Sequence, residues 1–263
     1  MSHVRLAAIV AGFIGVAVIT GCRSAGPPPV IDSALASCVP PGTVALAGID
    51  LDQLRSKAIY RSMPQSTLGS IEILRDASYL LIASNGKDLL VIARGKFRAA
   101  PAGATLLSPS LAIAGPAETI RAAGKQHKTG VTGAPRILEW AAGIASGKPV
   151  WAAAQGGITL PLTGNAANLN RILHFTEYLT LAAQIDLRVQ VDFTGVCPTA
   201  DASRQLEESL RALLTFSTIG SDRKSDLTPI LKSIEIRRDD LKVHATLSAS
   251  QESAAKLLGE LVR

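Results

Sequence analysis

Residues 77–95, ASYLLIASNGKDLLVIARG, decide the fold. Two apolar runs, YLLIA and LLVIA, flank the dipeptide Asn85-Gly86, and this pattern is the strongest short signal for a β-hairpin. A two-residue type I′ turn needs positive φ at both central residues, which asparagine and glycine tolerate better than other residues do. Since the runs are apolar at nearly every position, we expect the first-half strands to be buried on both faces of their sheet.

The same order of elements is predicted twice along the chain. Residues 43–51 predict a strand, 52–63 a helix, 77–97 and 104–115 two hairpins, and 116–125 a helix. The order returns as a strand at 149–156, a helix at 166–175 and hairpins at 178–193 and 233–248, with an amphipathic helix between the hairpins and another at the end. We therefore predict an α+β fold of two similar halves, each an antiparallel sheet with helices packed on one face, produced by internal duplication. Chance similarity of two α+β halves is the alternative.

The second-half strands alternate between apolar and polar residues, unlike those of the first half. Leu187, Val189, Val191 and Phe193 are separated by polar residues, which is typical of a strand with one buried and one wet face. The wet face is the candidate binding surface, and a merely solvated sheet face is the alternative. Its predicted members are Arg188, Gln190, Asp192, Glu235, Arg237, Lys242 and His244.

The first 24 residues have the layout of an export signal. Arg5 precedes an uncharged apolar run, residues 6–19, that is too short to span a bilayer. The following Ile19-Thr20-Gly21-Cys22 resembles the lipobox of bacterial lipoproteins. The resemblance implies cleavage before Cys22, a diacylglycerol on its thiol and acylation of the new amine, which together make a stable anchor. A plain signal peptide with a chance cysteine is the alternative.

The lipoprotein resemblance also implies a location. An aspartate after the lipidated cysteine favours retention at the inner membrane, whereas this chain has Arg23. We therefore expect a periplasm-facing protein anchored to the outer rather than the inner membrane. The opening Pro40-Pro41-Gly42, a strand and then Asp50-x-x-x-Leu54-Arg55 is similar to bacterial lipoproteins of unassigned function, and implies no activity.

The lipoprotein resemblance and the order of the predicted elements together imply five segments. They are a signal peptide (1–21), a lipid-anchored Pro-rich tether (22–41), the first half (42–130), a linker (131–148) and the second half (149–263). Trp140 and Trp151 flank the junction between the halves, and we expect them to cement it. After lipidation of Cys22, two cysteines remain, Cys38 and Cys197. In the oxidising periplasm they could form a disulfide, and two buried free thiols are the alternative.

Charge and residue spacing exclude several functions. The chain has 27 Lys and Arg against 21 Asp and Glu, but no basic cluster, and only 4% aromatic residues, so we expect no nucleic-acid partner. Attraction to anionic headgroups beside the anchor is an alternative use of the basic charge. His127, His174 and His244 have no ligand-type neighbours at metal spacing, and we expect no metal or cofactor.

The function predicted from the sequence is that of a non-catalytic binding or scaffold module, held at the membrane by its lipid and contacting a protein of the envelope. A periplasmic carrier for an apolar ligand or lipid is the alternative. A hydrolase ranks third. Ser221-x-x-Lys224 and Lys128-Thr129-Gly130 match two motifs of penicillin-binding proteins, but in the reverse order along the chain.

Overall fold

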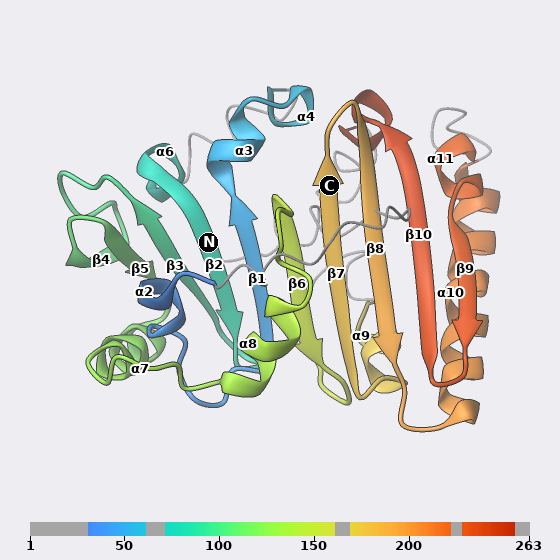
Figure 1. Cartoon of the computed structure of the whole chain (residues 1–263), viewed down its shortest axis with the longest axis horizontal. Helices are drawn as coiled ribbons and strands as arrows, with labels where there is room; N and C mark the ends of the chain where they lie inside the picture. The colour runs from blue at the N-terminus through green and yellow to red at the C-terminus, as the bar shows by residue number, and fades with distance from the viewer. Residues whose placement is uncertain (1–30, 62–71, 161–168, 222–227, 256–263) are drawn as a thin grey trace.

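The computed structural model describes residues 31–61, 72–160, 169–221 and 228–255. The predicted signal peptide and Cys22 lie outside these ranges. The described residues form one antiparallel sheet of ten strands with helices on both faces (Figure 1). The strand order is β4-β5-β3-β2-β1-β6-β7-β8-β10-β9. The strands are β1 (Ala45–Asp50), β2 (Ala77–Ser84), β3 (Leu89–Gly95), β4 (Ala104–Ser108), β5 (Leu111–Ala114), β6 (Val150–Gln155), β7 (Tyr178–Ile185), β8 (Arg188–Val196), β9 (Glu235–Asp239) and β10 (Lys242–Ser250).

The two predicted sheets are one continuous sheet, because the first strand of each half pairs with the other. β1 pairs with β2 on one side and with β6 on the other, and Gly48 lies opposite Trp151. The Trp151 side chain is only 1% exposed, and its Nε1 donates a hydrogen bond of 2.8 Å to Oη of Tyr79. A methyl group on Gly48 would overlap both of these side chains. Trp151 therefore cements the junction, as predicted, in space that Gly48 leaves open.

The hairpin at Asn85 forms, but its turn differs from the prediction. Ser84 pairs with Leu89, so the loop has four residues instead of two. Gly86 has a φ of +90°, whereas Asn85 does not enter the positive region. The Asn85 carboxamide oxygen instead accepts hydrogen bonds from the backbone N–H groups of Lys87 (2.9 Å) and Asp88 (2.7 Å). Asparagine thus acts through its side chain, as it does in Asx turns.

We call the face of the sheet that is turned toward the viewer in Figure 1 the front face. Two helices lie in front of the first-half strands there, and a third lies at the lower end of these strands and is seen nearly end-on. The first two are α2 (Ser33–Ala36) and α8 (Pro135–Ala142), the third is α7 (Ala117–His127), and their buried residues share one cluster with the front side chains of β1–β3. α2 lies within the predicted tether and α8 within the predicted linker. Both assignments are therefore wrong for these residues, because Leu35 of α2 and Ile137 of α8 are buried in the core.

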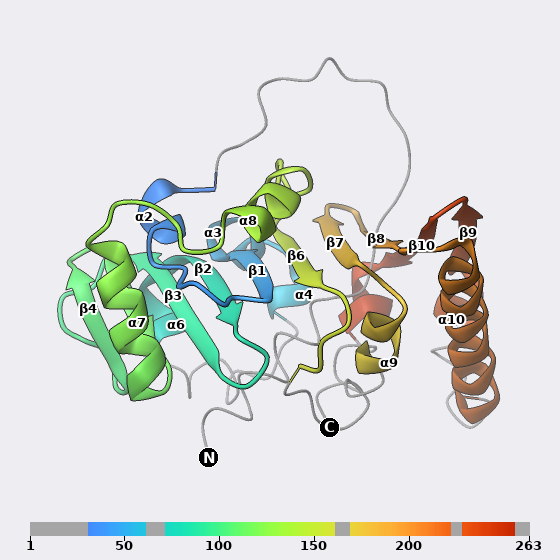
Figure 2. The ribbon, with the colours of Figure 1, turned by 90° about the horizontal axis from the view of Figure 1, so that it is seen from below.

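The remaining described helices pack at the back face. They are α3 (Leu51–Arg55), α4 (Ala58–Arg61), α6 (Ile73–Asp76), α9 (Leu169–His174), α10 (Ala200–Ser221) and α11 (Thr228–Lys232), and residues 251–255 are also helical. Asp50 caps α3 by accepting from the backbone N–H of Gln53 (2.9 Å), and Thr199 accepts from the N–H of Ala202 at the start of α10 (3.1 Å). Figure 2 shows α10 beside β9 at one edge of the sheet and α7 near the opposite edge. Within the described ranges, no helix has both the length and the hydropathy needed to cross a membrane.

The burial of the strands matches the predicted contrast between the halves only in part, because β6 and β7 of the second half also have consecutive buried residues. β1, β2 and β3 have consecutive runs of buried residues, whereas β8 and β10 alternate. One predicted inward residue of β8 is misplaced: Leu187 lies in the β7–β8 turn and is 95% exposed. The strand begins at Arg188, so its first inward residue is Val189 and not Leu187.

Cys38 and Cys197 are both free and buried. Cys38 belongs to the front cluster beneath α2 and α7, while Cys197 lies in the cluster beneath α9 and α10 on the back face. The sheet separates the two thiols, so the structure contradicts the disulfide and matches the alternative of two free thiols. Burial raises the pKa of the Cys38 thiol to about 11, although the hydrogen bond with Ser37 opposes the rise.

Candidate functional site

All seven predicted surface residues lie on the front face of β8, β10 and β9. Their side chains alternate with the buried ones along each strand, and the structure has no described helix in front of these three strands (Figure 1). We call this surface the polar sheet face. Together with three residues that the prediction did not include, its members are Arg188, Gln190, Asp192, Thr194, Glu235, Arg237, Lys242, His244, Thr246 and Ser248.

The strand register arranges these residues in rows across the sheet. His244 of β10 lies opposite Arg237 of β9 and Thr194 of β8, and its Nδ1 is 3.1 Å from Oγ1 of Thr194. The next row runs from Glu235 through Thr246 to Asp192. Directly opposite residues in antiparallel strands have Cβ atoms about 5 Å apart. The rows therefore join basic, acidic and hydroxyl groups into one surface.

Two arginines on this face are held by neighbouring groups. Arg188 donates from Nε to Oγ of Ser248 (2.9 Å) and from Nη2 to its backbone oxygen (3.0 Å). Arg237 forms an ion pair with Glu235 at 2.8 Å, and both of these side chains are more than half exposed. Hydrogen bonds fix the orientation of Arg188, while the exposed pair leaves both partners open to solvent and to another molecule.

Asp192 is the acidic group at the centre of the face. Partial burial raises the pKa of its carboxyl group, and the charges of Lys148 and His244 oppose this rise. In the same row, Asp192 lies opposite Ala182, which is 3% exposed, so its inner neighbour is apolar. No hydrogen bond to another described residue ties the carboxylate, so it can accept hydrogen bonds from a ligand or partner.

Helix α8 forms the border of the polar sheet face on its inner side. The ring of Trp140 stacks on Tyr178 of β7, with centroids 4.5 Å apart, and the guanidinium of Arg136 lies 5.1 Å from the Trp140 ring centroid. Arg136 also pairs with Glu177 at 2.9 Å. Sequence reasoning placed Trp140 near the junction but missed this stack, because α8 lay in the predicted linker. Thr194 could have been found, since it continues the polar positions of β8.

The groups considered for catalysis are dispersed. Within the described residues, no three His, Cys, Asp or Glu side chains gather as metal ligands. Nδ1 of His127 is 2.8 Å from Oγ of Ser37, a buried hydroxyl that also donates to the backbone oxygen of Ala34. His174 is exposed at the end of α9. Lys128, Thr129 and Gly130 form the turn after α7, while Lys224 lies outside the described residues.

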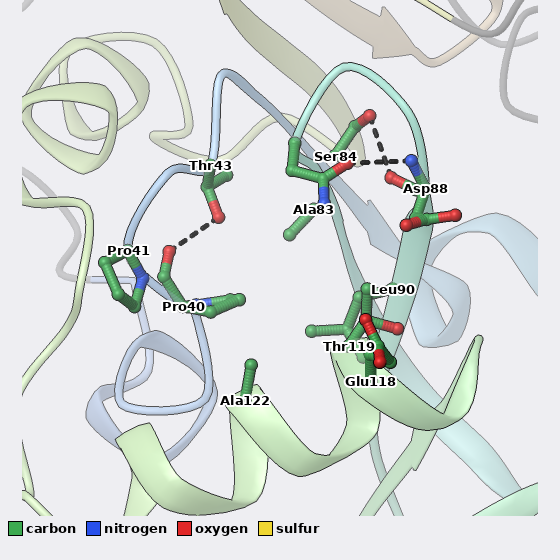
Figure 3. Close-up of a pocket in the computed structure, with 11 residues that line it drawn as sticks. Pro40, Pro41, Thr43, Ala83, Ser84, Asp88, Leu90, Glu118, Thr119 and Ala122 are labelled. Carbon is green, nitrogen blue, oxygen red and sulfur yellow. Dashed lines mark hydrogen bonds between the residues drawn. The ribbon is translucent and has the colours of Figure 1, made fainter.

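Two pockets lie within single halves and away from the junction. One, of about 260 Å³, is open to solvent between the Pro40-Pro41 loop, the β2–β3 hairpin and the start of α7 (Figure 3). The other, of about 320 Å³, lies between α9 and α10 and is lined by Ile172, Phe175, Gln205, Glu208, Ser209, Ala212 and Leu213. The carrier alternative required a cavity between two sheets, whereas the described strands form one continuous sheet.

Comparison with known proteins shows a similarity of fold only. No family model matches the chain, and no curated protein sequence matches it. Among solved structures, crystal form III of TP0453 aligns with a TM-score of 0.52 and 10% identity over 86% of this chain and 97% of TP0453. Crystal form I of TP0453 aligns with a TM-score of 0.48 and 11% identity over 87% and 98% of the two chains. The first likeness shows that this chain shares the overall fold of TP0453, an α+β arrangement built on a large antiparallel sheet.

Proposed function

We propose that this chain is a lipid-anchored protein of the bacterial envelope, facing the periplasm from the outer membrane, and that it binds a partner protein without catalysis. The observation that carries the proposal is the polar sheet face. In the first half, helices cover the front of the sheet, whereas the fronts of β8, β10 and β9 have no described helix over them. A broad face with both charge signs favours a polar partner surface, because complementary charges on a partner can pair with it.

The anchor is tested first, since the location depends on it. A Cys22→Ala variant and globomycin-treated cells should both give a chain that is not cut before residue 22. The intact mass of the mature wild-type protein should show acyl chains on Cys22. Normal processing of the Cys22→Ala variant would contradict the lipoprotein assignment while leaving the polar sheet face unaffected.

The binding surface is tested by crosslinking in living cells. A photoreactive amino acid at Thr246, in the middle of the polar sheet face, should crosslink to one envelope protein. The same group at Arg204, an exposed position of α10 on the other side of the molecule, is the control and should not. Reversing the charge of Arg237 and Lys242, two exposed residues of the face, should abolish the Thr246 crosslink. Equal crosslinking at Thr246 and Arg204, or none at Thr246, would contradict the proposal.

The carrier function is a second proposal, moved to the pocket between α9 and α10. Ile172, Phe175 and Leu213 contribute an apolar lining that suits part of an acyl chain. Native mass spectrometry of the protein extracted from membranes should then show a bound lipid, and Ala212→Trp should displace it. A ligand-free mass for the wild-type protein would count against this function.

We also propose that the two halves arose by internal duplication. Counted outward from the centre, the first half has the order β1-β2-β3-β5-β4 and the second has β6-β7-β8-β10-β9. The two orders are the same, and β1 and β6 pair antiparallel at the centre. A half-turn that exchanges β1 and β6 should therefore superpose the two halves strand for strand, and failure of that superposition would contradict the duplication.

A further inference from the structure

The outer side of helix α7 has a row of basic residues. Thr119 and Ala123 point inward and are buried, while Arg121, Lys125 and Lys128 are exposed. Spacings of four and three residues place these three side chains on one side of the helix. Arg121 pairs with Glu118 at 3.4 Å, whereas no acidic side chain of the described chain lies within ion-pair distance of Lys125 or Lys128. We call Arg121, Lys125 and Lys128 the basic row.

The described chain begins beside the C-terminal end of this helix. Oγ of Ser37, just after α2, is 2.8 Å from Nδ1 of His127, the last residue of α7. Leu35 of α2 and Ala123 of α7 are buried in the same cluster. Asp32, which caps α2, pairs with Arg94 of β3. The start of the described chain is therefore held next to the C-terminal end of α7, where Lys125 and Lys128 lie.

The covalent chain limits how far the acylated residue can lie from α7. Asp32 lies ten positions after Cys22 in the sequence. Even a fully extended chain of that length spans only about 35 Å. The α2–α7 side of the body consequently stays close to the bilayer that holds the acyl chains, and docking there is an intramolecular event at high effective concentration.

We propose that the basic row docks on anionic lipid headgroups of the membrane that carries the N-terminal lipid. This inference rests on the proposed lipid anchor. The occupant is a negatively charged lipid surface, because three basic side chains on one side of a helix complement it and the tether brings them to it. Each unpaired basic residue raises binding to an anionic surface roughly fivefold, so Lys125 and Lys128 together raise it about 25-fold.

The test is a lysine footprint of the full mature protein in vesicles. The lipidated protein is reconstituted into vesicles of pure phosphatidylcholine or of phosphatidylethanolamine with phosphatidylglycerol, and acetylation of each lysine is measured by mass spectrometry. Lys125 and Lys128 should be acetylated several-fold more slowly in the anionic vesicles only. High salt should remove the protection, because the Debye length falls to about 3 Å at 1 M. Lys242, exposed on the polar sheet face, is the control and should react equally in both.

Each outcome decides between explanations. Equal acetylation of Lys125 and Lys128 in both vesicle types, on protein whose mass shows the acyl chains, overturns the docking proposal and leaves the anchor intact. Absence of acyl chains overturns the anchor and this inference with it. Protection in cells but not in protein-free anionic vesicles also overturns it, since the basic row would then contact a protein. In the wild-type protein, the backbone amides around Arg121 should exchange hydrogen more slowly in the anionic vesicles than in the phosphatidylcholine vesicles. The matched variant with Lys125→Glu and Lys128→Glu should show no such difference.

Discussion

Replacing Gly48 with alanine tests the central packing of the sheet. At an ordinary strand position, Gly→Ala stabilises a protein by about 0.5–1 kcal/mol, because it lowers the entropy of the unfolded chain and favours the strand. Here the new methyl group would overlap the indole of Trp151 and the hydroxyl of Tyr79. We therefore expect Gly48→Ala to destabilise the protein instead of stabilising it.

The size of the effect follows from how little the neighbours can move. Trp151 is 1% exposed and is bonded to Tyr79, whose pKa is raised to about 12, mainly by its own burial. Overpacking a rigid core costs about 1–3 kcal/mol, and loss of the Trp151–Tyr79 hydrogen bond adds about 1 kcal/mol. After subtracting the entropic gain, we expect Gly48→Ala to lower the free energy of unfolding by about 2 kcal/mol.

The assay is urea unfolding followed by circular dichroism, with the free energy taken from linear extrapolation. Gly124→Ala is the matched control, because the nearest atom to a Cβ there is 4.0 Å away and α7 should gain about 1 kcal/mol from alanine. A Trp151→Leu background should remove the overlap with the indole and leave that with Tyr79, so that Gly48→Ala costs less there. If Gly48→Ala alone were as stable as the wild type, the packing argument at the β1–β6 junction would be refuted.

Three further predictions concern single groups. The folded mature protein should show almost no thiol reactivity at neutral pH, since burial raises the pKa of Cys38 to about 11, and unfolding without a reductant should release two thiols, Cys38 and Cys197; a count of zero would indicate a disulfide. Glu207→Gln should lower the free energy of unfolding by about 1 kcal/mol at neutral pH, because Glu207 joins α10 to Arg238 of β9. The pKa of Glu207 is lowered, chiefly by a hydrogen bond from Arg211, so its stabilising contribution is present above the ordinary carboxyl pKa and disappears as the pH falls through the lowered value. Below that pH, urea titrations of the two proteins should give equal stabilities. Asp192→Asn should raise the melting temperature at pH 7, because burial raises the pKa of Asp192 and its ionisation opposes folding as the pH rises through that value; an unchanged or lower melting temperature would contradict this assignment.

Local sequence patterns predicted the strands and the faces of this fold well. The alternation in β8 and β10 identified the wet side of the second half, and all seven residues named from it share one surface. The continuous apolar runs of the first half correctly indicated burial on both faces. Alternation and continuous apolar runs are properties of residues that are neighbours in the sequence, so a short window is enough to detect them.

Features that depend on distant partners could not be predicted in the same way. The sequences of β1 and β6 carry no signal of their pairing, apart from a glycine in β1 that lies opposite a tryptophan in β6. Lys148 influences Asp192 from a loop, so its spacing along the chain carries no signal. The segment with α8 was mistaken for a linker because its eight residues are flanked by glycine-rich stretches, and the buried side of so short a helix gives a weak pattern.

The β1–β6 pairing has a consequence for how the chain acquires its structure. A protein that is exported from its N-terminus delivers β1 about a hundred residues before β6, and until then β1 has an open hydrogen-bonding edge. Contacts between residues so far apart form slowly, because a long loop must close first. On the export route that we propose, the half that emerges first would therefore expose an apolar strand edge of the kind that seeds aggregation. Folding without aggregation would then require that this edge be covered, for example by a periplasmic chaperone, until β6 pairs with β1.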